Sequence, residues 1–223
     1  KAKNAWASLT EELETLAAQG FDAFKARVEQ ATGGIVFTGH PTFALSKDLR
    51  TALADHVVSA TKTSRNMLMR QIRADSRAWN QQISLQGEHD EVQGAIAHAA
   101  NAQLAYATVL ISFSRKAFPD EWRSLKIFVP TLACWVGYDL DGRADIHWSQ
   151  SLTFRLTEKA VQLDRYATQL ESISGSQKIG PIAKLTQRLK TASEDTARHS
   201  ALFAADLTDP DNLVPAANAL TEH

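Results

Sequence analysis

The chain has 223 residues, of which 44% are hydrophobic and 22% charged, and its 24 basic side chains nearly balance its 25 acidic ones. This composition is ordinary for a globular protein with a substantial core. The net charge of -1 provides no field that would attract nucleic acid or an anionic membrane. Cys134 is the only cysteine, which excludes an internal disulfide, and we expect a reducing, cytoplasmic location.

Helical periodicity dominates the sequence, and the first predicted helix opens with a capping box formed by Ser8 and Glu11 and stops before Gly33. A short β-prone run, Ile35 to Phe37, follows the two glycines and leads into a loop that carries His40. Because the first residue is Lys1, we expect the chain to be a piece of a longer protein.

A second helical region begins after this loop, where Ser46 can cap a helix. We expect a buried face, on one helix or on two consecutive ones, that consists of Leu49, Leu53, Val57, Met67, Leu68 and Ile72. After a break near Gly87, another helix runs to Pro119. Its stretch 95–113 looks apolar but contains His98, Asn101, Gln103 and Tyr106, so we expect a buried or interfacial helix rather than a membrane span.

The run from Lys126 to Val136 is the other strand-like segment, and it ends in a loop rich in acids and glycine. Helices are predicted again over 149–173, 181–206 and 210–220. We therefore expect a mainly α-helical chain that forms a single helical unit over 1–223. Since an isolated pair of strands is marginally stable, either the two strands lie together under many helices or the rest of their sheet lies outside this chain.

His40 stands at the end of the first strand-like run, between Gly39 and Pro41. Glycine permits a close backbone approach and proline stiffens the exit, so the imidazole would be held in one place. It could act as a general base, a proton shuttle or a hydrogen-bond donor to an anion. A histidine that only completes a turn is an equally good interpretation.

Asp139 and Asp141 in the second loop point roughly the same way if the backbone is extended. They could bind a divalent cation, hold a basic ligand group or orient an arginine. Asp-Leu-Asp-Gly is also an ordinary turn sequence, and for the pair taken alone a turn is the favoured interpretation. The spacing of later acids excludes an EF-hand.

Taken together, the two loops resemble phosphoenolpyruvate carboxylases. The sequence Val-Phe-Thr-Gly-His-Pro-Thr, ending at Thr42, resembles the family's Val-x-Thr-Ala-His-Pro-Thr-Glu, which is followed after two residues by an arginine pair. Trp-Val-Gly-Tyr-Asp-Leu-Asp-Gly-Arg, ending at Arg143, resembles the family's Trp-Met-Gly-Gly-Asp-Arg-Asp-Gly-Asn-Pro. Order and separation agree, and the resemblance covers nearly the whole chain but only the N-terminal portion of the family.

This resemblance implies the helix-rich N-terminal portion of a (β/α)₈ barrel that contributes about two parallel strands. It implies a homo-oligomeric, magnesium- or manganese-dependent enzyme that makes oxaloacetate from phosphoenolpyruvate and bicarbonate. His40 would then be catalytic, and Lys47, Asp139, Asp141 and Arg143 would contribute to substrate binding. The metal ligands would lie in the rest of the parent protein, so this chain alone is expected to be inactive.

The chain departs from the family pattern at several positions: Phe43 replaces a glutamate, Ser46 and Lys47 replace the arginine pair, and Leu140 replaces another arginine. In the second motif Tyr138 replaces a glycine, and Arg143-Ala144 replaces Asn-Pro. Lysine at position 47 keeps a charge but lacks the bidentate fork of arginine. The alternative is therefore a non-catalytic helical relative that binds an anionic metabolite or a protein partner. An unrelated helical scaffold with two structural turns is the third possibility.

Overall fold

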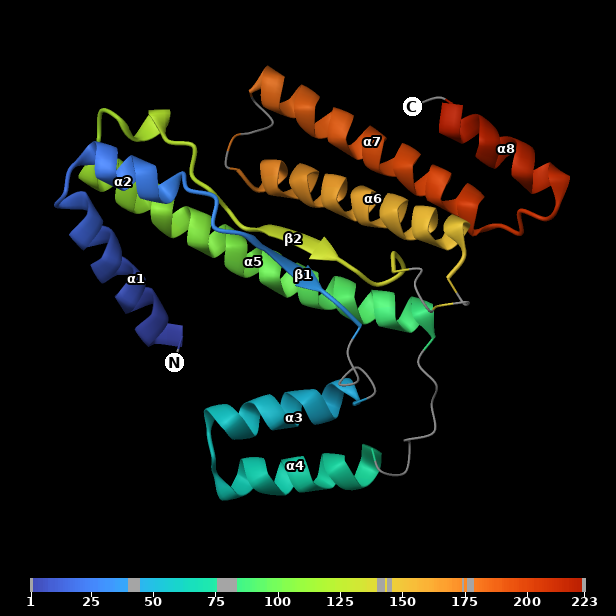
Figure 1. Ribbon diagram of the computed structural model, residues 1–223, viewed down its shortest axis with the longest axis horizontal. Helices are drawn as coiled ribbons and strands as arrows, with labels where there is room; N and C mark the ends of the chain where they lie inside the picture. Colours follow the sequence, from blue (N-terminus) through green and yellow to red (C-terminus); the bar gives the residue numbers. More distant parts are fainter. Residues whose placement is uncertain are drawn as a thin grey trace. The chain divides into compact units, whose positions relative to one another are not determined.

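The computed structural model describes residues 2–39, 45–75, 84–139, 143, 146–173, 175 and 179–221, with the side chains of 2–5 and 75 left out. These residues are mainly helical, as predicted (Figure 1). The helices are α1 (Ala2–Ala17), α2 (Phe21–Val28), α3 (Lys47–Val58), α4 (Lys62–Asp75), α5 (Leu85–Ala117), α6 (Trp148–Ser172), α7 (Gly180–Ala204) and α8 (Pro210–Thr221), with a 3-10 turn η2 (Trp122–Ser124). None of these described helices has both the length and the apolar character needed to cross a bilayer.

The two strands are β1 (Gly34–Phe37) and β2 (Thr131–Cys134), and they pair in parallel. Gly34 lies opposite Thr131, and Phe37 lies opposite Cys134. The family resemblance implied about two parallel strands, and the described residues contain such a pair. The second strand occupies only four residues of the run 126–136 that has strand character.

The chain divides into two compact units: Lys1–Thr38 with Glu91–Cys134, and Gly39–Asp90 with Trp135–His223. The core of the first unit consists of Leu13, Phe24, Val28 and Leu110, with Tyr106, Val109, Phe113 and Phe118 packed against them. Phe24 is fully buried, and its ring centroid lies 5.1 Å from that of Phe118 and 5.9 Å from that of Phe113. This aromatic cluster fixes α2 against α5, beside which β1 and β2 run (Figure 1).

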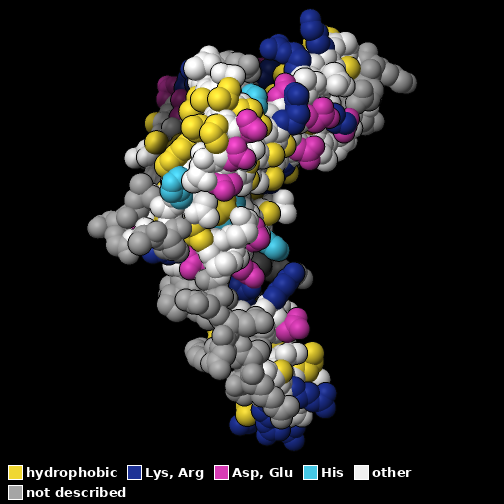
Figure 2. All heavy atoms as spheres, turned by 90° about the vertical axis from the view of Figure 1, so that its right-hand side faces the viewer, with side chains coloured by type: hydrophobic (Ala, Val, Ile, Leu, Met, Phe, Trp, Pro, Cys, Tyr) yellow, Lys and Arg dark blue, Asp and Glu magenta, His cyan; other side chains and the backbone are white. Residues whose placement is uncertain are grey.

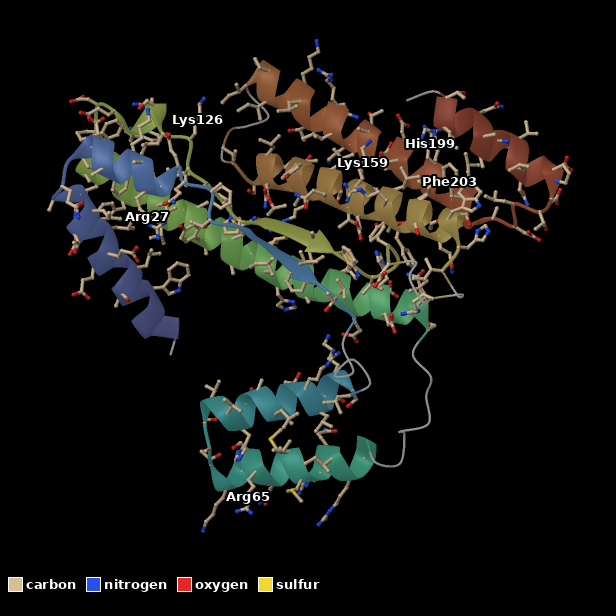
Figure 3. The ribbon with its side chains drawn as sticks, viewed as in Figure 1. Arg27, Arg65, Lys126, Lys159, His199 and Phe203 are labelled. Carbon is tan, nitrogen blue, oxygen red and sulfur yellow. The ribbon has the colours of Figure 1, made fainter. Side chains whose placement is uncertain are left out.

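The prediction of a single helix that opens at Ser8 and stops before Gly33 is wrong in two respects. The first helix already begins at Ala2, and it ends at Ala17 before a second helix starts at Phe21. Gly20 has φ 97°, a left-handed conformation that a helix cannot contain. The chain therefore turns there, which lets Leu13 and Phe24 reach one core; an ion pair of 3.6 Å between Arg27 and Glu12 spans the turn (Figure 3).

In the second unit, α3 and α4 form a helical hairpin. Ser46 caps α3 as predicted, because its Oγ accepts a hydrogen bond from the Leu49 N–H at 3.1 Å. The apolar positions of this region fall on two helices, and the prediction that they form a buried face is wrong for most of them. Only Leu49 is buried, whereas Leu53, Val57, Met67 and Ile72 are exposed within these described helices. Figure 2 shows Lys and Arg side chains gathered over the lower part of the view, where α4 contributes Lys62, Arg65, Arg70 and Arg73.

Helices α6 and α7 lie side by side in the second unit, and α8 packs against α7 (Figure 1). Hydroxyl groups line the contact between α6 and α7: the Oγ atoms of Thr157 and Ser200 lie 2.9 Å apart, and Ser193 donates to the Ala160 carbonyl. Phe203 of α7 is 3% exposed, and its ring meets Trp148 of α6 edge-on (Figure 3). This pair of long helices supports the second loop.

Candidate functional site

The carboxyl ends of β1 and β2 coincide, because Phe37 and Cys134 are paired in a parallel register. The loops that follow β1 and β2 therefore both begin at the same edge of the two-stranded sheet. The first loop begins with Thr38 and Gly39, and the second with Trp135 and Val136. This is the arrangement that open and closed parallel sheets use to assemble sites from several loops.

Two of the predicted site residues, His40 and Asp141, lie outside the described residues, as do Phe43 and Leu140. Lys47 is the first residue of α3 and is exposed. Asp139 and Arg143 are both half-buried in the second loop. Of the predicted site residues, the structure therefore describes Lys47, Asp139 and Arg143, together with the neighbours of the two motifs.

Gly39 and the second motif approach each other closely. A Cβ at Gly39 would lie 3.6 Å from the Val136 Cγ2 and 3.4 Å from the Glu88 Oε2. The same Glu88 oxygen lies 3.5 Å from Nη1 of Arg143. Glu88 of α5 therefore joins the first motif to the last residue of the second.

The ion pair between Glu88 and Arg143 is partly open to solvent, with side chains 23% and 38% exposed. Pairs of this kind contribute about 0–1 kcal/mol to stability. The ion pair matters mainly for position, because Glu88 holds the Arg143 guanidinium beside the two loops and compensates part of its charge.

Gly137 fixes the start of the second loop. It has φ 86°, and a Cβ there would lie only 2.4 Å from the Phe154 Cδ2. Its carbonyl accepts a hydrogen bond of 2.6 Å from the Ser151 hydroxyl. No other residue fits this turn without moving the Phe154 ring, so α6 holds the loop by both sterics and hydrogen bonding.

Beneath this turn lies a buried polar network that the sequence interpretation did not find. His89 of α5 is 1% exposed and stacks on Phe154, with ring centroids 4.0 Å apart. Its Nε2 lies 3.1 Å from Oε1 of Glu158, while the Tyr138 hydroxyl donates to Oε2 of the same carboxylate at 3.1 Å. Both carboxylate oxygens are therefore engaged, as a carboxylate with a side chain only 16% exposed requires.

The network could not be found from spacing, because Glu158 is 69 residues from His89 and 20 from Tyr138. One signal was available: a tyrosine stands in the second motif where the family it resembles has a glycine. A buried tyrosine hydroxyl needs a partner, and that requirement points to a polar group on a neighbouring helix.

A divalent metal has few ligands in the described part of the two loops. Asp139 is the only carboxylate among residues 38–39, 45–46, 135–139, 143 and 146–147. Mg²⁺ prefers octahedral coordination by several oxygen atoms, and Glu88 is already paired with a guanidinium. These residues by themselves do not make a metal site, and a metal would need ligands from elsewhere.

Comparison with protein-family models, characterised proteins and solved structures gives no match for this chain.

Proposed function

We propose that this chain is the N-terminal portion of a divergent phosphoenolpyruvate carboxylase. The observation that carries the proposal is the convergence of the two motifs. Their loops follow strands that pair in parallel, with Phe37 opposite Cys134, and Gly39 approaches Val136 closely. A single active site built from both motifs requires this convergence.

In this proposal β1 and β2 are neighbouring strands of a (β/α)₈ barrel whose other strands belong to the rest of the parent protein. Each proposed site residue then lies at the carboxyl end of the strands, where such barrels hold their active sites. The parent is expected to be a cytoplasmic homo-oligomer.

The proposed reaction transfers a phosphoryl group and then forms a carbon–carbon bond. A bicarbonate oxygen attacks the phosphorus of phosphoenolpyruvate, the enol oxygen leaves, and carboxyphosphate and the pyruvate enolate are formed. Carboxyphosphate breaks its carbon–oxygen bond to release CO₂ and phosphate. The enolate carbon then attacks CO₂ and gives oxaloacetate.

His40 would donate a hydrogen bond to carboxyphosphate and keep the released CO₂ beside the enolate. Lys47 and Arg143 would supply positive charge to the phosphate oxygens, and Asp139 and Asp141 would orient these cations. Mg²⁺ or Mn²⁺, when bound through ligands in the rest of the parent, would neutralise the developing enolate charge.

The test is a coupled oxaloacetate assay on the intact parent with phosphoenolpyruvate, bicarbonate and Mg²⁺. We expect His40→Asn to lower kcat at least a hundredfold, because a positioned hydrogen-bond donor to a developing oxyanion contributes about 10²–10³ to the rate. The matched control is His98→Asn, on the exposed face of α5, which should keep full activity. Full activity of His40→Asn, with oxaloacetate still formed, would refute the catalytic assignment.

One observation favours the non-catalytic alternative. Arg143 is paired with Glu88 at 3.5 Å, so the cation that follows the lost family arginine by three residues in the sequence is partly neutralised. Under that alternative the parent binds phosphoenolpyruvate without turning it over. Titration calorimetry with phosphoenolpyruvate alone would then give heat of binding while the coupled assay gives no oxaloacetate.

A further inference from the structure

The outer face of α5 in the first unit is exposed and unusually uncharged. No Asp, Glu, Lys or Arg occurs from 92 to 114. The opposite side of the helix is covered, since Tyr106, Val109, Leu110 and Phe113 pack in the core. Leu104 is nevertheless 49% exposed and Ile111 44% exposed. An exposed helix face of this composition is typical of a surface that another helix covers.

Eight of the exposed positions on α5 form one stripe with heptad spacing. Spaced alternately by four and three residues, they are Asp90, Gly94, Ala97, Asn101, Leu104, Thr108, Ile111 and Arg115, and all are exposed. This is the spacing of the contact positions when two helices pack side by side, and the large apolar side chains among the eight are Leu104 and Ile111. We call these residues the α5 seam. Beside it, Ala105 and Ser112 are small and exposed, which lets a second backbone approach closely.

The α5 seam is complementary to itself when a second copy runs in the opposite direction. With the two-fold axis between Asn101 and Leu104, each position faces one of different size: Gly94 faces Ile111 and Ala97 faces Thr108. Asn101 then faces Leu104 of the other copy, so that the largest side chains lie opposite smaller ones. A two-fold interface requires this reciprocity.

The charged residues at the ends of the α5 seam favour the same antiparallel orientation as the side-chain sizes. In the antiparallel register Asp90 faces Arg115, at both ends of the seam, because the two-fold axis repeats the pair. A parallel pair would instead place like charges together. Opposite charges at the ends of a contact favour one orientation over the other, and antiparallel helix dipoles add to the preference.

We propose that α5 is a dimerisation surface through which two copies of this chain associate by antiparallel pairing of the α5 seam. The proposal does not rest on the proposed function. A single pair of helices lies near or below the low end of specific interfaces, which bury about 1,200–2,000 Å². The dimer is therefore weak, with a dissociation constant on the order of micromolar.

Cross-linking tests the pairing directly. Ala97→Cys and Thr108→Cys are made separately in a Cys134→Ala background and treated with a short bismaleimide. In the proposed dimer, position 97 of one copy faces 108 of the other, whereas 97 and its own symmetry mate are about 16 Å apart along the helix. We expect a 1:1 mixture of the variants to give a cross-linked dimer and either variant alone to give little.

Sedimentation equilibrium provides the second measurement. Ile111→Lys places a charge in the seam opposite Gly94 and should raise the dissociation constant at least tenfold. The control is Val161→Lys on α6, a valine that is 61% exposed and lies outside the seam, which should leave association unchanged. Circular dichroism confirms that both variants are folded.

Charge exchange tests the orientation. Arg115→Glu should weaken the dimer, and adding Asp90→Arg in the same chain should restore it. The proposal is overturned if the mixture of cysteine variants does not cross-link at concentrations above the expected dissociation constant. It is equally overturned if each variant cross-links with itself, since that result means parallel pairing. A chain that stays monomeric in sedimentation equilibrium above the expected dissociation constant overturns the proposal as well.

Discussion

Replacing Gly137 by alanine tests how α6 holds the second loop. At φ 86° a non-glycine residue is strained by about 1–2 kcal/mol. The added Cβ would also meet the Phe154 ring at 2.4 Å and 2.7 Å, and overpacking of this kind typically costs about 1–3 kcal/mol. The two terms together predict a loss of about 2–5 kcal/mol, a large part of a total stability of about 5–15 kcal/mol.

Alanine substitutions at two other glycines measure the cost of the backbone conformation without the steric clash. Gly175 has φ 76° and Gly20 has φ 97°, and a Cβ at either would meet nothing within 4 Å. Denaturant unfolding followed by circular dichroism should therefore show Gly137→Ala to be destabilised more than Gly175→Ala by about 1–3 kcal/mol. Equal losses in these three alanine variants would refute the argument from Phe154.

Two further predictions concern carboxylates with defined partners. Glu158→Gln replaces one of the two carboxylate oxygens, which contact His89 and Tyr138 separately, by an NH₂ group that cannot accept, and because the network is buried we expect a loss of about 1–3 kcal/mol in the free energy of unfolding. The hydroxyl and backbone N–H of Thr208 hold the pKa of Asp206 below its usual value, so Thr208→Ala should raise that pKa, as followed by NMR titration of the carboxyl carbon. A depressed pKa stabilises the fold above the ordinary carboxyl pKa, and this contribution is lost as the pH falls through the folded value.

Each of these changes has a control. Glu14→Gln alters an exposed carboxylate on α1 and should leave stability within about 0.5 kcal/mol. Thr221→Ala removes a hydroxyl that bonds only the Asn218 carbonyl, and the pKa of Asp206 should not change. An unaltered Asp206 titration in Thr208→Ala, or unaltered stability in Glu158→Gln, would contradict the respective contact.

The strands and caps could be predicted because their signals are local. Ile35, Val36 and Phe37 are β-prone and follow two glycines, and Ser46 stands directly before a helical pattern. Both features appear in the structure at those residues. The two strand-like runs themselves left the pairing open, and a parallel pair was implied only by the family resemblance; the parallel register of Phe37 with Cys134 agrees with it.

The division between α1 and α2 could not be predicted from periodicity. Ser8 and Glu11 match a capping box but lie inside a helix that starts at Ala2. A pattern of this kind also occurs within helices, where the backbone N–H groups already have partners. The decisive residue was Gly20, whose left-handed backbone is required by the packing of Leu13 and Phe24 in one core.

The start of α5 is a second helix boundary that the sequence pattern located only approximately. A break was expected near Gly87, but α5 begins at Leu85 and the Ser84 hydroxyl accepts a hydrogen bond from the Gly87 N–H. Glycine is tolerated in the first turn when a serine precedes it as a cap.

The hydroxyls between α6 and α7 determine how the two helices can move. Ser200 donates to the Thr153 carbonyl, and Ser193 donates to that of Ala160, seven residues further along α6. A slip of one or two residues would misalign both bonds at once, at a cost of about 1–3 kcal/mol for each buried group left without a partner. Helices α6 and α7 therefore have one preferred alignment along their axes. The end of α6 that contacts Gly137 cannot slide along α7 without breaking these hydrogen bonds.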